Sequence, residues 1–184
     1  RTLFRMPDVL CLGLGGGTRI HADPLCLGPD SVGYRLTQEG RVFGGDVLTA
    51  TDMGVARGRA IIGAPERVAN IPAATLDWFD AEVKTMLEDG IDSMKTRAGD
   101  VPLIAVGGGS FLIPESLRGV SDVLFVEHHD VANAVGAAMA KISGEVDQGF
   151  NNIGREDAIR TAIAMAEERA LNAGAAPSSI ETIE

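Results

Sequence analysis

The sequence is poor in several residue types and patterns that mark common protein classes. It has 184 residues, only two cysteines (Cys11 and Cys26) and three histidines, and it lacks a Cys-x-x-Cys pair. This scarcity argues against a disulfide framework or a zinc site and fits a reducing cytoplasm. No apolar stretch reaches the roughly 20 residues that cross a bilayer, and no signal peptide is visible. We therefore expect a cytoplasmic protein that does not enter a membrane.

Positive charge is also scarce. Lysine and arginine number 16 against 26 aspartates and glutamates, for a net charge of −10. Nucleic acids and anionic membranes are bound by basic patches. The balance therefore predicts neither partner.

Three nucleotide or catalytic motifs are missing or incomplete. The Gly-Lys-Ser/Thr of a P-loop is absent. Residues 13–18 approach a dinucleotide fingerprint, but Thr18 replaces the third glycine and no acidic residue closes a second strand about 20 residues later. Residues 108–112 fail as a nucleophile elbow, because Leu112 stands where glycine is needed. Ser110 is therefore interpreted as a helix cap or ligand contact rather than a nucleophile.

The pattern of apolar residues predicts a single α/β domain over residues 1–184. Hydrophobic residues make up 45% and charged residues 23%, which is an ordinary globular balance. Residues 19–45 are rich in glycine, proline and aspartate and predict loop with short strands. Buried strands are expected at 8–15, 101–106 and 122–126 in one sheet, the last two parallel. Helices are expected at 72–94, 113–117, 130–143 and 156–173.

Two glycine segments follow two of these expected strands. One is Gly15, Gly16, Gly17 and Thr18, and the other is Gly107, Gly108, Gly109 and Ser110. Glycine at the carboxyl edge of a sheet leaves bare backbone where ligands of α/β proteins bind. Two such edges predict a nucleotide-sized ligand.

Three further positions have both a structural and a functional interpretation. Asn133 and Gly136 lie in a stripe of small residues, which fits either tight packing or a helix lining a nucleotide cleft; a buried Asn133 would need a partner. His128, His129 and Asp130 are interpreted as a strand end and helix cap, since neighbouring strand residues face opposite ways. Asp52 fits a helix cap better than a metal ligand.

Five motifs occur in an order that resembles a known family. They are GLGGGTRI (13–20), GPDSVG (28–33), FGGDVLTATD (43–52), VGGGS (106–110) and VANAVGAA (131–138). Together they resemble the carboxyl-terminal half of the ATPase subunit in the hydantoinase A and 5-oxoprolinase family. The resemblance extends from about residue 7 to residue 177.

The resemblance implies a ribonuclease H-like, actin-like ATPase subdomain with a mostly parallel sheet flanked by helices. It implies that Gly107 to Ser110 lie against the adenosine of ATP, that Asn133 and Gly136 belong to a closing helix, and that Gly15 to Thr18 lie near the cleft or support it. The implied cofactors are ATP and Mg²⁺, and the implied substrate is a small cyclic amide that is opened by phosphorylation of its amide oxygen. A second hydantoinase-type subunit is the implied partner, and a homo-oligomer is compatible with the sequence.

The sequence departs from this family in one respect. The family's Asp-x-Gly-Gly-Thr phosphate loop does not occur in residues 1–184. We therefore expect a piece of a longer protein that is inactive by itself, since nothing would position the phosphates. The alternatives are a ketone carboxylase subunit, a non-catalytic ATP-binding regulator or reactivase, and a scaffold that has lost its nucleotide contacts.

Overall fold

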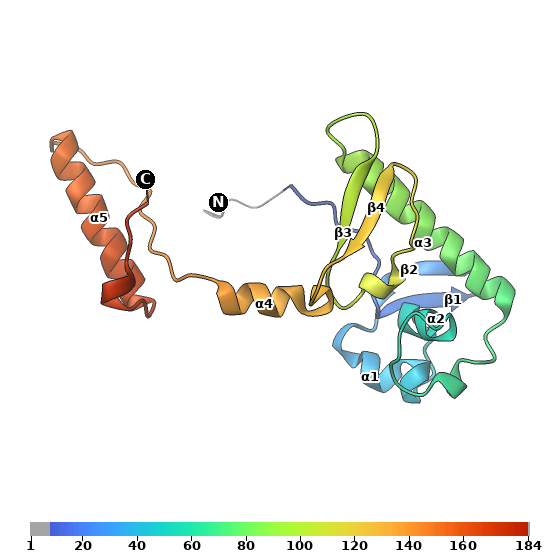
Figure 1. Cartoon of the computed structure of the whole chain (residues 1–184). Helices are drawn as coiled ribbons and strands as arrows, with labels where there is room; N and C mark the ends of the chain where they lie inside the picture. The colour runs from blue at the N-terminus through green and yellow to red at the C-terminus, as the bar shows by residue number, and fades with distance from the viewer. Residues whose placement is uncertain (1–7, 184) are drawn as a thin grey trace. The chain divides into compact units, whose positions relative to one another are not determined.

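The computed structural model describes residues 8–183. Within these residues the fold is mixed α/β, with five α-helices and two small sheets (Figure 1). The chain forms two compact units, the first ending at Asn133 and the second beginning at Ala134. The main hydrophobic core lies in the first unit. In the described part of the second unit, Ala170 is the one buried apolar residue.

The first sheet is a hairpin of β1 (Thr18–Ala22) and β2 (Leu25–Ser31). The strands are antiparallel, and Ile20 lies opposite Leu27. A single 3-10 turn (Gly33–Arg35), the short helix α1 (Leu36–Glu39) and a second turn (Arg41–Phe43) follow. The expectation of loop with short strands in this region is confirmed.

The strand expected at residues 8–15 is wrong. These residues form no strand, and Val9 and Leu10 are 58% and 48% exposed. The side chains of Leu10 and Leu12 instead lie against Gly90, where an added Cβ would be 3.2 Å from a Leu12 methyl carbon. An apolar run of this length gives no information on whether a neighbouring strand exists to pair with it.

Helix α2 (Ala50–Ala56) begins with a capping box. The N-cap is Thr49 and not, as was expected, Asp52; Asp52 occupies the third helical position and completes the capping box. The Asp52 side chain is fully buried. One carboxylate oxygen accepts from Val42 N at 2.7 Å, and the other accepts from Thr49 N at 2.7 Å and Thr49 Oγ1 at 2.8 Å. Asp52 therefore fixes both the start of α2 and the preceding loop.

Helix α3 (Ala73–Met94) is the longest element and confirms the helix expected at 72–94. Pro72 precedes it with extended backbone, and its buried face carries Leu76, Phe79 and Val83. These side chains share the core with Ile20 and Met53, from β1 and α2. Figure 1 shows α3 extending from this core toward the second sheet. At that end, Glu88 accepts from Arg118 N at 2.8 Å.

The second sheet consists of β3 (Val101–Ala105) and β4 (Val120–Phe125). The two strands are parallel, as expected, with Leu103 opposite Val123. Residues 8–15 form no strand beside them, so the expectation of one sheet that includes 8–15 is wrong. Ile104 and Leu124 pair on one face and are 58% and 44% exposed, so the expectation that these strands are buried is wrong.

The connection between β3 and β4 lacks the helix expected at 113–117. Its one regular piece is the 3-10 turn Ser110–Leu112, which ends at Ile113 in extended backbone. Proline clashes with helical backbone at the residue before it, and Pro114 follows Ile113 directly. The proline therefore stops the helix before it can form.

A 3-10 turn (His129–Val131) leads into α4 (Ala132–Met139). The expected helix 130–143 is thus shorter, and Asp130 lies inside the turn instead of capping the helix. Helix α5 (Arg155–Asn172) confirms the helix expected at 156–173. A last 3-10 turn spans Pro177–Ser179. Of the helices that the structure describes, none combines the length and apolar character needed to cross a bilayer.

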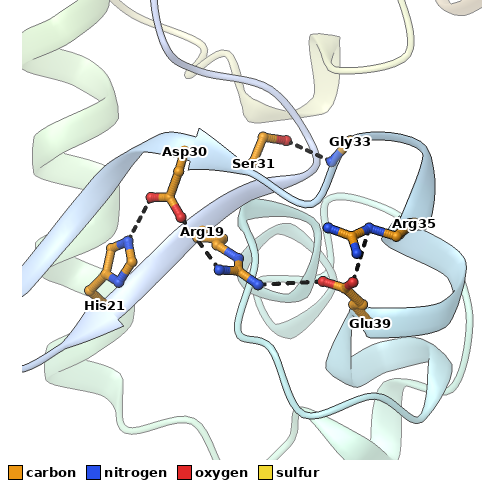
Figure 2. Close-up of polar contacts among 7 residues, drawn as sticks. All are labelled: Arg19, His21, Asp30, Ser31, Gly33, Arg35 and Glu39. Atoms are coloured by element: carbon orange, nitrogen blue, oxygen red, sulfur yellow. Dashed lines mark hydrogen bonds and ion pairs between the residues drawn. The ribbon is translucent and has the colours of Figure 1, made fainter.

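A chain of charged side chains joins the hairpin to α1 (Figure 2). His21 Nε2 lies 2.7 Å from Asp30 Oδ1, and Arg19 lies 3.6 Å from Asp30 and 3.4 Å from Glu39. Glu39 also accepts from Arg35 at 3.1 Å. The hydrogen bond from His21 lowers the pKa of Asp30 below its ordinary value of 3.8, and the charge of Arg19 adds to this. Positively and negatively charged side chains alternate in this cluster, so each charge is paired with one of opposite sign inside the cluster.

We predict that Asp52→Asn lowers the free energy of unfolding by about 1–3 kcal/mol. Asparagine and aspartate are near-equal caps, but both oxygens of this carboxylate accept hydrogen bonds, and an amide nitrogen in either place would face a buried donor. The measurement is urea unfolding. The matched control is Asp46→Asn, because Asp46 is an exposed aspartate in the same loop. It should change the free energy of unfolding by less than about 0.5 kcal/mol. Equal stability of the two variants would contradict this role.

We also predict that the stabilisation from the His21–Asp30 pair disappears in acid. Because the folded pKa of Asp30 is lowered, its contribution is present above the unfolded value of 3.8 and is lost as the pH falls through the folded value. The difference in stability between the wild type and His21→Gln should therefore shrink between about pH 5 and pH 2. Thermal melts of both proteins across this range test it. A difference in stability that stays constant over this pH range would show that protonation of Asp30 is not linked to folding.

Candidate functional site

An open cleft of about 850 Å³ lies in the first unit at the second sheet. One wall is the loop after α2, from Arg59 to Ile62, and the other is the connection that follows β3, including Gly108 and Ser110. Phe125, at the end of β4, and His129 complete it. A second hollow of about 330 Å³ lies between β1 and the start of α3 and is mostly apolar. We take the larger cleft as the candidate site, because it contains the predicted glycine segment.

The parallel pairing of β3 and β4 builds this cleft. Both strands end at the same edge of the sheet, which is where α/β sheets bind ligands. Gly107 N donates to His129 O at 2.6 Å and so ties the two strand ends together. Gly107 has φ of +90°, a conformation that other residues rarely adopt. A Cβ at Gly107, Gly108 or Gly109 would meet nothing within 4 Å, so bare backbone borders open space.

Ser110 brings a hydroxyl to the same place. The residue is only 5% exposed, and it lines the cleft. Its backbone N–H donates to Gly107 O at 3.0 Å. Within residues 8–183 its hydroxyl makes no hydrogen bond to the protein. This oxygen is not among the fully buried side-chain atoms that lack a partner, so it reaches the surface of the cleft, where it can donate to or accept from a ligand.

His129 is the residue of this cleft that sequence reasoning missed. Its Nδ1 lies 2.9 Å from Val126 O, and its ring meets that of Phe125 edge to face, with centroids 5.4 Å apart. His128 has φ of +60° and does not line the cleft. Both histidines lie after the end of β4, so the alternation of strand side chains expected for them does not apply. A histidine at the carboxyl end of a second parallel strand is the signal that could have identified it.

The charged residues of the cleft are two carboxylates and one guanidinium. Glu115 and Asp130 are exposed in its rim. Arg59 also lines it, but its Nη1 is held by Asp80 Oδ1 at 2.8 Å. Asp80 also binds Arg57 at 2.9 Å, and the hydrogen bond that Arg57 donates to Asp77 raises the pKa of Arg57. The cleft therefore offers more acceptors than free cations, which suits sugar hydroxyls and a base better than phosphates.

The first glycine segment does not line this cleft. Thr18 is 3% exposed, and its Oγ1 accepts from Gly15 N at 2.8 Å. Gly16 O accepts from both the backbone and the hydroxyl of Thr51 at 2.9 Å, and a Cβ at Gly17 would lie 2.8 Å from Ser31 Oγ. Gly16, Gly17 and Thr18 are therefore packed under α2, whereas a Cβ at Gly15 would meet nothing within 4 Å.

Helix α2 links these packed residues to the cleft. Thr51 at its start holds Gly16. Gly54, in its middle, allows the ring of Phe111 to approach so closely that a Cβ there would collide with it. Phe111 follows Ser110 and lines the cleft. The first glycine segment thus supports the site from behind.

The side-chain amide of Asn133, in helix α4, is not buried. Asn133 is exposed and makes no side-chain hydrogen bond in the described part of the chain, and it is not among the residues of the cleft. Gly136 belongs to the second unit, and its Cβ position borders open space. No residue of α4 is buried. The inference of a buried Asn133 is therefore wrong, because the stripe of small residues is not packed.

The described residues contain no cluster of ligands for the implied metal. Among residues 8–183, no group of three or more histidine, cysteine, aspartate or glutamate side chains is placed to hold an ion. We therefore assign Mg²⁺ to no residue of this chain.

Comparison with models of known families, with curated proteins and with solved structures finds no match to this chain.

Proposed function

We propose that this chain forms the adenosine side of the nucleotide cleft in an ATP-dependent enzyme that opens cyclic amides, of the hydantoinase and 5-oxoprolinase type. The observation that carries the proposal is the segment Gly107 to Ser110. It borders an open cleft at the shared carboxyl edge of two parallel strands, and it ends in Ser110, a buried residue that lines the cleft. The family resemblance of the ordered motifs supports the choice of ATP and of a cyclic amide.

The proposed role of each group follows from its chemistry. The bare backbone of Gly108 lets the flat face of a nucleoside approach. Phe111 and Phe125 provide apolar surface for the base, and stacking of a base on an aromatic ring is worth about 1–3 kcal/mol. The carboxylates of Glu115 and Asp130 can accept hydrogen bonds from ribose hydroxyls.

The chain's part in the reaction is positional. Bound ATP supplies the phosphoryl group that activates the amide oxygen of the substrate, as the resemblance implies. Holding the nucleoside in one orientation fixes where its phosphates emerge, and positioning supplies most of the catalysis of phosphoryl transfer. The cleft has two rim carboxylates and one paired arginine, so we place the phosphates beyond it. No residue of this chain is assigned to the chemical step.

Replacement of Gly108 by valine should weaken binding of a non-hydrolysable ATP analogue by about tenfold or more, which corresponds to about 1.4 kcal/mol. A Cβ there meets nothing within 4 Å and the residue's φ is not positive, so the variant should fold with unchanged stability. Calorimetric titration and thermal melts of the intact protein test this. Gly149→Val, at another open glycine outside the cleft, is the control. Equal affinity of both variants would remove Gly108 from the site.

The activity itself is tested by substrate-stimulated ATP hydrolysis. We expect hydantoin or 5-oxoproline to stimulate ADP release by the intact protein with its partner subunit, and Gly108→Val to abolish the stimulation at low ATP. Stimulation by a ketone with bicarbonate would instead indicate the carboxylase. ATP binding without stimulation by either would indicate the non-catalytic regulator, and absence of ATP binding would indicate the scaffold.

A further inference from the structure

We infer that His129 binds the ligand of this cleft directly, with Nε2 as the acceptor for an N–H or O–H group of the nucleoside. This inference rests on the proposed nucleotide function and assigns a specificity-determining residue to it. The candidate donors on the ligand are the exocyclic amine of adenine and the ribose hydroxyls, which share the same chemistry toward an imidazole nitrogen.

The tautomer of His129 follows from its contact with the backbone. Nδ1 lies 2.9 Å from the carbonyl oxygen of Val126. A carbonyl oxygen only accepts, so Nδ1 must carry the hydrogen. In the neutral ring, Nε2 is then left with its lone pair as an acceptor.

The ring of His129 is also held in place before any ligand arrives. Its own backbone N–H donates to Val126 O at 3.1 Å, and its carbonyl accepts from Gly107 N at 2.6 Å. The ring packs edge to face against Phe125, at an interplanar angle of 73°. A side chain that is fixed in advance loses little conformational freedom on binding, so its hydrogen bond contributes more to affinity.

The other polar groups of the cleft favour the same kind of ligand. Glu115 and Asp130 are acceptors when ionised, and the guanidinium of Arg59 is engaged by Asp80 at 2.8 Å. The hydroxyl of Ser110 both donates and accepts. Acceptors therefore outnumber free donors, and the cleft selects a ligand portion that carries donors over one that carries anionic oxygens.

Two substitutions separate ligand binding from a purely structural role of His129. In His129→Asn the amide nitrogen can take the place of Nδ1 and keep the bond to Val126, but no atom remains at the position of Nε2. In His129→Gln the longer side chain returns an amide to that position. His128→Asn is the control: His128 lies outside the cleft, and asparagine tolerates its φ of +60°.

Calorimetric titration of the intact protein with a non-hydrolysable ATP analogue tests the inference. His129→Asn should weaken binding about five- to tenfold, as expected for one lost hydrogen bond. His129→Gln should recover part of the loss, and His128→Asn should bind like the wild type. Thermal melts of all variants should agree within a few degrees, which shows that the turn survives.

Analogues of the ligand identify the donor. One analogue replaces adenine by hypoxanthine, and two others lack the 2′ or the 3′ hydroxyl. The analogue without the contacted group should bind the wild type more weakly and should not be weakened further by His129→Asn. If His129→Asn binds every analogue as the wild type does while Gly108→Val does not, the role of His129 is overturned and the nucleotide site stands. If the wild type binds no ATP analogue, both are overturned.

Discussion

The buried carboxylate of Asp52 connects the loop before α2 to the start of that helix, and the arrangement of the first unit follows from this connection. Its oxygens accept hydrogen bonds from the backbone of Val42 and Thr49, so the loop and the helix cannot shift independently. From the fixed helix, Thr51 reaches back to Gly16 and Gly54 receives the ring of Phe111. The wall of the cleft beside Ser110 is therefore positioned by a carboxylate that does not itself face the cleft.

The two glycine segments look alike in sequence and differ in use. Gly16 and Gly17 are glycines because neighbouring side-chain oxygens leave no space for a Cβ. At Gly108 the Cβ position is empty, so the absence of a side chain leaves room for something outside the protein. Glycine that accommodates the fold and glycine that accommodates a ligand can be told apart only when the surrounding atoms are known.

The sequence predicts long periodic elements well and single contacts poorly. Helices α3 and α5 and the parallel pairing of β3 and β4 follow from periodicity and two-sided apolar character. The segment 8–15 was unpredictable because its apolar side chains pack on α3, a contact between residues far apart in sequence. The place of His129 in the cleft was not predicted for a similar reason, since it depends on a turn and on the hydrogen bond to the carbonyl of Val126.

The left-handed backbone at His128 bears on how natural or engineered variants of this chain are interpreted. Glycine, asparagine and aspartate accept that conformation, whereas a β-branched residue opposes it by roughly 1–2 kcal/mol. Valine or isoleucine there would tend to unwind the turn that holds His129 at the cleft. A substitution at this solvent-exposed position, which is outside the cleft, would thus weaken ligand binding as a substitution in the cleft does. Exposure of a residue at this turn therefore does not show that its substitution is harmless.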